Sequence, residues 1–255
     1  MKLTLLGKKL AAICIYISIA VSNANSQVSV AREWNEILLE AIRNDFARPT
    51  VHARNLYHHS IIAYDSWAVY SPSKDTYLIG DTLNGYISNF DGINVPLEID
   101  EAIEEVISYA SFYFINHRYG DSPDYNTTYL LMYNYMTEHG YSVNNSNIDY
   151  VNGGAAELGN YIASQILNYG NSDGSNEFLD FQNTFYSSIN PPLIMSEDGN
   201  PDIVDPNRWQ TLTLDSTIDQ SGNLVDNTLP FLSPEWGNVK PFALKPSMAA
   251  QNFRD

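Results

Sequence analysis

The sequence has very little cysteine and little positive charge. Its 255 residues contain one cysteine, Cys14, and 13 Lys plus Arg against 30 Asp plus Glu, for a formal net charge of −17. Because Cys14 lies in an apolar run near the N-terminus, disulfides and thiolate metal sites are excluded from the chain that follows it. Nucleic acid and anionic membranes need basic surface, so the acidic balance argues against both as partners. A small anion in a locally basic pocket remains open.

The first 26 residues have the pattern of a secretory signal peptide. Lys2, Lys8 and Lys9 precede an apolar run of 12 residues, 10–21, and small residues suited to cleavage follow at 22–24 or 24–26. The run is shorter than the roughly twenty residues that a membrane-spanning helix needs. We therefore expect residues 1–26 to be removed on export, which changes the formal charge from −17 to −20, and the mature protein to be periplasmic or extracellular and free of the membrane.

Residues 30–70 hold the densest regular apolar pattern and predict a helical hairpin. In the first half, apolar residues recur at helical spacing opposite charged ones: Trp34, Ile37, Leu38, Ala41, Ile42 and Phe46. Pro49 separates the halves, and Thr50 is placed to cap the second helix. That helix carries one continuous stripe, which we expect to be core: Ala53, Leu56, Tyr57, Ser60, Tyr64, Trp67 and Ala68.

Three further helices are predicted, at 100–117, 122–140 and 147–170, after a loop at 71–96. In the last helix Ala155, Gly159 and Ala163 repeat every four residues, a seam along which another helix could approach closely. The expected fold is therefore all-α, with about five helices in residues 27–170.

Residues 171–255 differ from the part before them. Eight of the 12 prolines lie there, and only short runs such as 177–186 favour a helix. So long an irregular segment is unusual inside a compact domain. We expect it to pack on helices of a C-terminal half that this sequence lacks, which would make the chain part of a larger domain.

Histidines are the first candidates for chemistry. His52, His58 and His59 cluster on the second helix, but no HExxH pattern or neighbouring Glu completes a metal site. Hydrogen bonding between helices is the favoured role. His117 and His139 lie near glycines at predicted helix ends, where the helix dipole favours them.

The remaining candidates are polar loops and arginines. Residues 198–205 place oxygen-bearing side chains at alternate positions but fail the calcium-loop pattern at Ile203 and Trp209, so a solvated turn is favoured. Residues 171–175 have the composition of a flexible connection. Arg208 and Trp209 are expected in a cation–π contact or in the core. For Arg43, Arg48 and Arg54, surface pairing with nearby acids is expected.

Two blocks carry a family resemblance. WNEILLEAIRNDFARPTVHARNLYHHS at 34–60 resembles the opening of bacterial secreted proteins of the vanadium-dependent haloperoxidase group, relatives of the type 2 phosphatidic acid phosphatases. DPNRWQ at 205–210 with FLSPEWGNVKPFAL at 231–244 resembles the same group at the same relative place. The resemblance implies, for the complete protein, peroxide-dependent halide oxidation on bound vanadate.

The vanadate-binding motifs of that group are absent. Arg48-Pro49 is the only Arg-Pro, Ala41 stands where the partner lysine belongs, and Pro246-Ser247 is followed by Met248 in place of Gly-His. No catalytic, cofactor-binding or metal-binding residue is therefore assigned, and no cofactor is expected for this chain alone. Two alternatives stay open: a phosphatase of the same superfamily, and a non-catalytic exported helical domain for binding or scaffolding. The oligomeric state is not predicted.

Overall fold

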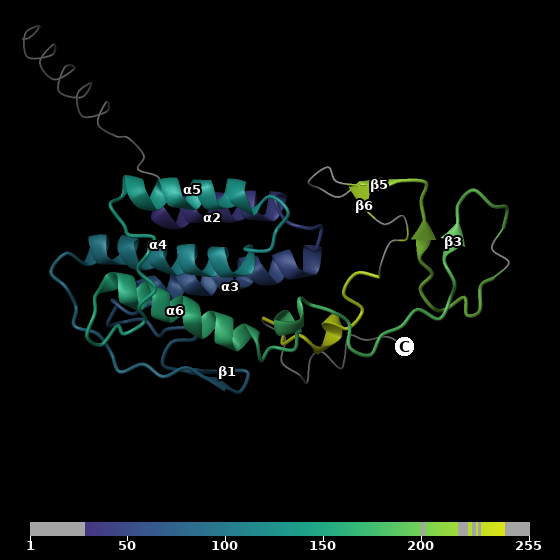
Figure 1. Ribbon diagram of the computed structural model, residues 1–255. Helices are drawn as coiled ribbons and strands as arrows, with labels where there is room; N and C mark the ends of the chain where they lie inside the picture. The colour runs from purple at the N-terminus through teal and green to yellow at the C-terminus, as the bar shows by residue number, and fades with distance from the viewer. Residues whose placement is uncertain (1–28, 200–201, 219–223, 226–227, 229–230, 243–255) are drawn as a thin grey trace, which may run out of the picture.

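The computed structural model describes residues 29–199, 202–218, 224–225, 228 and 231–242. The predicted signal peptide and residues 243–255 lie outside this part of the chain. Five helices form a bundle: α2 (Val30–Arg43), α3 (Pro49–Ala68), α4 (Ile99–Arg118), α5 (Tyr125–Glu138) and α6 (Ala155–Gly170) (Figure 1). The fold is mostly helical, with a long irregular segment after α6, as the sequence predicts. None of the helices described is both long and apolar enough to span a membrane.

Helix α4 lies at the centre of the bundle. It contacts α6, α3, α2 and α5, and Figure 1 shows α2 and α5 on one side of the α3 and α4 layer with α6 on the other. Trp34 of α2 is fully buried and donates its indole N–H to the Ser108 hydroxyl of α4 at 3.1 Å. The core side chains that are fully buried include Leu38, Ile62, Val106, Ala110, Phe114, Ile115, Met132, Met136, Ile162, Ala163 and Ile166.

The predicted small-residue seam is the contact between α6 and α4. At Gly159, an added Cβ would lie 2.6 Å from the Val106 carbonyl oxygen and 2.8 Å from the Tyr109 Cβ. The two backbones therefore approach at a distance that only glycine permits at this position.

The start of α6 differs from the prediction. The helix begins at Ala155 rather than near residue 147, because the Asn145 and Asn147 side chains accept backbone N–H groups two residues on, each at 3.1 Å. Such local turns compete with helix formation. The Glu157 carboxylate then accepts the Gly154 N–H at 2.8 Å and defines the helix start.

The segment 71–96 is not only a loop. It contains a short antiparallel hairpin, β1 (Thr82–Leu83) and β2 (Tyr86–Ile87). The start of this segment is fixed by the buried Asp65 of α3, which accepts the backbone N–H groups of residues 77, 78 and 79 at 2.5, 2.9 and 3.0 Å. Asp65 lies on α3 and its partners lie in the segment that follows it, so the spacing of apolar residues within the helix could not predict this interaction.

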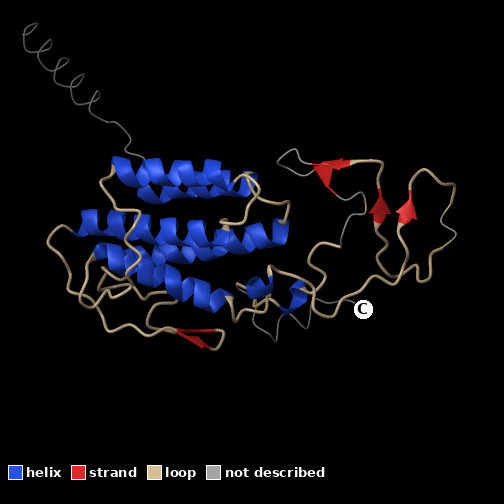
Figure 2. Ribbon diagram, viewed as in Figure 1, coloured by secondary structure: helices blue, strands red, loops and turns tan. Residues whose placement is uncertain are grey.

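The segment after Gly170 runs from one end of the bundle and extends away from it (Figures 1 and 2). It contains two single-turn 3₁₀ helices, η1 (Glu177–Leu179) and η2 (Trp236–Asn238), so the helix favoured over 177–186 is reduced to η1. Its strands are two residues each: β3 (Leu193–Ile194) pairs in parallel with β4 (Leu212–Thr213), and β5 (Thr217–Ile218) pairs antiparallel with β6 (Leu224–Val225).

Helix α3 buries a different side from the one that the sequence predicts. Leu56, Tyr64 and Trp67, predicted as core, are 39%, 40% and 40% exposed, while the polar side chains on the other side of the helix are buried. Those buried polar residues are His52, Arg54, Asn55, His58, His59, Asp65 and Ser66. The prediction was wrong because Arg54, Asn55, His58, His59 and Asp65 find partners on α2, α4 and the segments after α3 and α6, which helical spacing within α3 does not reveal.

Candidate functional site

A buried charge cluster joins α3, α4 and the turn that follows α6. Arg54 of α3 is 5% exposed, and its guanidinium donates to the Asp173 carboxylate at 2.5 Å, to Glu177 at 2.6 Å and to the Gly170 carbonyl at 3.0 Å. The Asp173 and Glu177 carboxylates lie 119 and 123 residues further along the chain. This end of the bundle is therefore closed by charge-assisted hydrogen bonds.

Arg118, the last residue of α4, is the second cation of this cluster. It donates to both oxygens of Glu177, at 2.9 and 3.0 Å, and to the Asn55 side-chain oxygen at 2.8 Å. Burial, then the neighbouring charge of Arg54, lowers the pKa of Arg118 to about 10, so it stays charged at neutral pH. Two cations and two carboxylates make the cluster neutral overall.

His58 completes the cluster as a neutral side chain. Its Nδ1 lies 2.8 Å from Arg118 Nη2, a group that can only donate, so Nδ1 accepts and the proton is on Nε2. Nε2 lies 3.7 Å from an Asp173 oxygen. Burial, reinforced by the charges of Arg118 and Arg54, lowers the pKa of His58 well below its usual value.

The lack of a side chain at Gly170 leaves room for the charge cluster. A Cβ there would lie 2.6 Å from nitrogens of Arg54 and Arg118 and from a Glu177 oxygen. Gly170 ends α6 and Arg118 ends α4, so both guanidinium groups lie near helix C-termini, where the dipole favours positive charge.

Two expectations from the sequence are corrected by this cluster. Arg54 is buried rather than paired at the surface, and residues 171–175 form a tight turn with a buried aspartate, Asp173, rather than a flexible connection. The surface pairing expected of Arg43 is confirmed with Glu40. Arg48 is partly buried, and it pairs with one buried acid, Asp45, and one exposed acid, Asp180. In the sequence, the only sign of the roles of Asp173 and Glu177 is that two acidic residues follow Gly170, the glycine that ends the helix.

His59 and His52 make hydrogen bonds, the role predicted for the histidine cluster, and His139 and His117 lie at helix ends, as predicted. His59 bridges three helices, with Nδ1 3.1 Å from the Asn35 side-chain oxygen and Nε2 2.9 Å from the Ser111 hydroxyl. His52 Nε2 lies 2.9 Å from the Phe46 carbonyl oxygen. His139 caps the end of α5 through the Tyr135 carbonyl at 2.8 Å, and His117 lies in the last turn of α4. Within the described residues no group of three or more His, Asp or Glu side chains is arranged to hold a metal ion.

The buried cluster does not fit a vanadate or phosphate ion. Such an ion needs fixed cations and donors around an open space. Arg54 and Arg118 are instead matched by Asp173 and Glu177, so their positive charge is already compensated. We therefore assign the cluster a structural role in holding the segment after α6 against α3 and α4.

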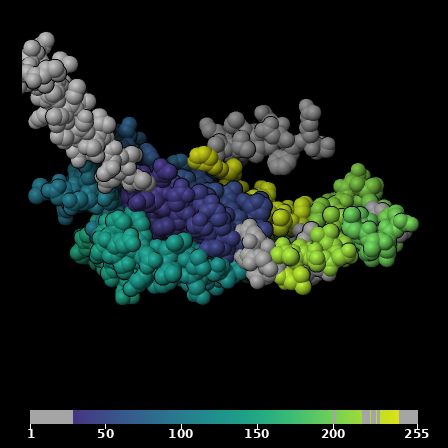
Figure 3. Space-filling view, turned by 90° about the horizontal axis from the view of Figure 1, so that it is seen from above, coloured from purple at the N-terminus to yellow at the C-terminus, as the bar shows by residue number. Residues whose placement is uncertain are grey.

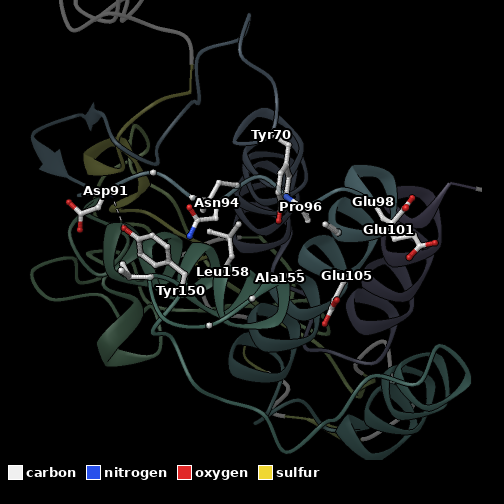
Figure 4. Close-up of a pocket in the computed structure, with 16 residues that line it drawn as sticks. Tyr70, Asp91, Asn94, Pro96, Glu98, Glu101, Glu105, Tyr150, Ala155 and Leu158 are labelled. Atoms are coloured by element: carbon white, nitrogen blue, oxygen red, sulfur yellow. Dashed lines mark hydrogen bonds between the residues drawn. The ribbon is translucent and has the colours of Figure 1, made fainter.

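A second candidate is an acidic cleft of about 620 Å³ between the 91–98 segment, α4 and the start of α6 (Figure 4). Asp91, Glu98, Glu101 and Glu105 line it, but Figure 4 shows their carboxylates spread along the cleft rather than converging. Burial, then the charge of Glu157, raises the pKa of Glu105. The negative charge of this cleft disfavours an oxyanion.

Side-chain hydrogen bonds also organise the irregular segment. Asn190 is buried and binds the backbone of 204–209: its side-chain oxygen accepts the N–H groups of Val204 and Asp205, and its amide donates to the Arg208 carbonyl. Within the predicted turn 198–205, Asn190 therefore holds Val204 and Asp205, while residues 200–201 lie outside the described part of the chain. Trp209 stacks on Phe231 at 4.8 Å, which brings together the stretches 205–210 and 231–242 of the second block.

Comparison with known proteins bears on the fold. No family model matches the chain, and no curated protein matches it. A solved structure described as an apo-type bacterial vanadium-dependent chloroperoxidase superposes with a TM-score of 0.53 at 16% identity, over 77% of this chain and 40% of that chain. The fold is therefore haloperoxidase-like. The chain spans 40% of the length of the chloroperoxidase that it matches.

Proposed function

We propose that this chain is the N-terminal helical portion of an exported vanadium-dependent haloperoxidase-like protein. The observation that carries the proposal is the superposition on the vanadium-dependent chloroperoxidase over 77% of the chain. The contact between Trp209 and Phe231 supports it, because it joins the two stretches, 205–210 and 231–242, of the second block that resembles the haloperoxidase group.

In this proposal the bundle is a scaffold, and vanadate belongs to residues outside the chain. The buried arginines Arg54 and Arg118 are neutralised, and the cleft near Glu105 is acidic, so neither supplies an oxyanion pocket. When bound, vanadate would supply the halide-oxidising chemistry; the residues of this chain would position the helices that hold it.

The uninterrupted gene product tests the proposed activity. We expect purified full-length protein to oxidise halide with peroxide only after vanadate is added, and the 255-residue chain to show no activity above buffer. Phosphomonoester hydrolysis without halide oxidation would instead identify a phosphatase of the same superfamily. A full-length product with neither activity would refute the proposal and leave a binding or scaffolding domain.

Export is tested separately. We expect the mature protein to lack residues 1–26, because their order of lysines, apolar residues and small residues is that of a signal peptide. Mass spectrometry of protein from the culture medium or periplasm measures the N-terminus. An intact Met1 on an exported product would contradict the expectation.

A further inference from the structure

The outward side of α3 is an apolar surface without charge. Ala53, Leu56, Ser60, Tyr64 and Trp67 are the exposed positions along this stretch of α3, and we call them the α3 face. Both charged residues of the helix, Arg54 and Asp65, are buried instead. In a chain of formal charge −17, a solvent-facing helix surface with no charged side chain indicates an interaction site.

The α2 helix shows the contrast. Its exposed positions include Arg32, Glu36 and Arg43, the pattern of a helix that faces water. The α3 face has aromatic and small residues at positions one helical turn apart, which is the surface that a second helix packs against. Since α2, α4 and α6 contact the other side of α3, none of the helices described covers the α3 face.

A groove runs along the α3 face and has a volume of about 330 Å³. Its lining residues are Tyr57, Ser60, Ile61, Tyr64, Tyr77 and Phe242. The tyrosine hydroxyls at its edges have partners: Tyr57 and Tyr77 bond each other at 3.2 Å, and Tyr64 donates to the Asp75 carbonyl at 2.9 Å. The groove therefore offers ring surfaces rather than free polar groups, and it fits an apolar side chain.

Phe242 shows which part of the chain reaches the groove. Its ring lies 4.7 Å from that of Tyr57, and Figure 3 shows the yellow C-terminal part of the described chain beside the purple and blue N-terminal helices. A segment that follows Phe242 in the sequence is covalently joined to a residue that lines the groove. A short covalent connection gives such a segment a high effective concentration at the α3 face.

We propose that the α3 face and its groove bind an amphipathic helix of the same polypeptide, encoded C-terminal to Phe242. This inference rests on the proposed function, in which later helices complete the domain. About 60% of the matched chloroperoxidase chain lies outside the superposition, so that fold has ample additional polypeptide to place there. A second copy of the chain is a weaker occupant, because it would bring together two molecules of formal charge −17 each.

Site-specific photo-cross-linking in the natural gene tests the proposal. A photoreactive amino acid replaces Tyr64 in one variant and Leu56 in a second, so that a folding failure at one position leaves the other informative. Glu36 on the exposed side of α2 is the matched control. Thermal melts of all three variants check that the bundle is folded.

We expect Tyr64 and Leu56 to give a cross-linked product with the mass of one chain, in which mass spectrometry finds a peptide encoded after Phe242, and Glu36 to give none. A product with the mass of two chains would identify a second copy and overturn the proposal. A cross-link to another protein, or no cross-link at either position, would also overturn it. The cross-link without halide oxidation would retain the docking surface and refute only the proposed function.

Discussion

Replacing Glu177 by Gln tests the structural role of the buried charge cluster. The Glu177 side chain is 10% exposed and accepts one hydrogen bond from Arg54 and two from Arg118, whose side chains are 3% and 1% exposed. Glutamine keeps the size but removes the charge, and its NH₂ group would face guanidinium donors. Removing one partner of a buried ion pair costs about 3–5 kcal/mol, because the remaining charge is left uncompensated.

Asp180→Asn is the matched control, from the same segment. Asp180 pairs with Arg48 at 2.8 Å but is 77% exposed, so its loss should cost less than about 1 kcal/mol. Urea unfolding followed by circular dichroism at pH 7 measures both changes. A domain is typically stable by about 5–15 kcal/mol, so Glu177→Gln should shift the midpoint strongly. If both variants unfold within error of each other, the cluster does not stabilise the fold.

The same cluster predicts a pH dependence. Burial alone would raise the pKa of Glu177, but the charges of Arg118 and Arg54 and their hydrogen bonds together hold the pKa below the usual 4.5. A carboxyl with a depressed pKa in the folded state stabilises the fold above its unfolded pKa, and this contribution is lost as the pH falls through the folded value. The difference in unfolding free energy between the wild type and Glu177→Gln should therefore shrink below pH 4.5. A difference that stays constant down to pH 3 would contradict this assignment.

Three further variants address other parts of the fold. Gly159→Ala should destabilise by about 1–3 kcal/mol, since its Cβ meets the α4 backbone, whereas Gly237→Ala, with nothing within 4 Å, should have little effect in the same urea assay. Burial lowers the pKa of His59 to about 4, so the unfolded state binds more protons than the folded state below pH 6.5. As the pH falls from 6.5 to 4, this residue should lower the free energy of unfolding by up to about 1.4 kcal/mol per pH unit, and His59→Asn should lose stability less steeply. Equal slopes for the wild type and the variant would refute the role of His59. Asp65→Ala leaves the buried N–H groups of 77–79 without their acceptor and should cost more than about 3 kcal/mol; a calorimetric melt close to wild type would exclude that anchoring role.

Local patterns in the sequence determined which helices form and where several of them end. Helical spacing of apolar residues, Pro49, Gly140 and Gly170 were sufficient for five helices, because these signals act within one or two turns. The Gly159 seam also followed from the sequence alone, since the close approach of two helices requires small residues at a helical interval. The start of α6 was misplaced where Asn side chains bind their own backbone.

Only the tertiary structure decided which side of α3 is buried and where the charge cluster forms. Arg54 meets Asp173 and Glu177 across more than a hundred residues, so no spacing rule within a helix could pair them. Because Arg54, His58 and Asp65 find partners inside the bundle, this side of α3 can be buried without leaving them unpaired, and the side that carries Leu56, Tyr64 and Trp67 faces outward. Periodicity identifies two sides of a helix, but the positions of distant partners determine which side lies inside.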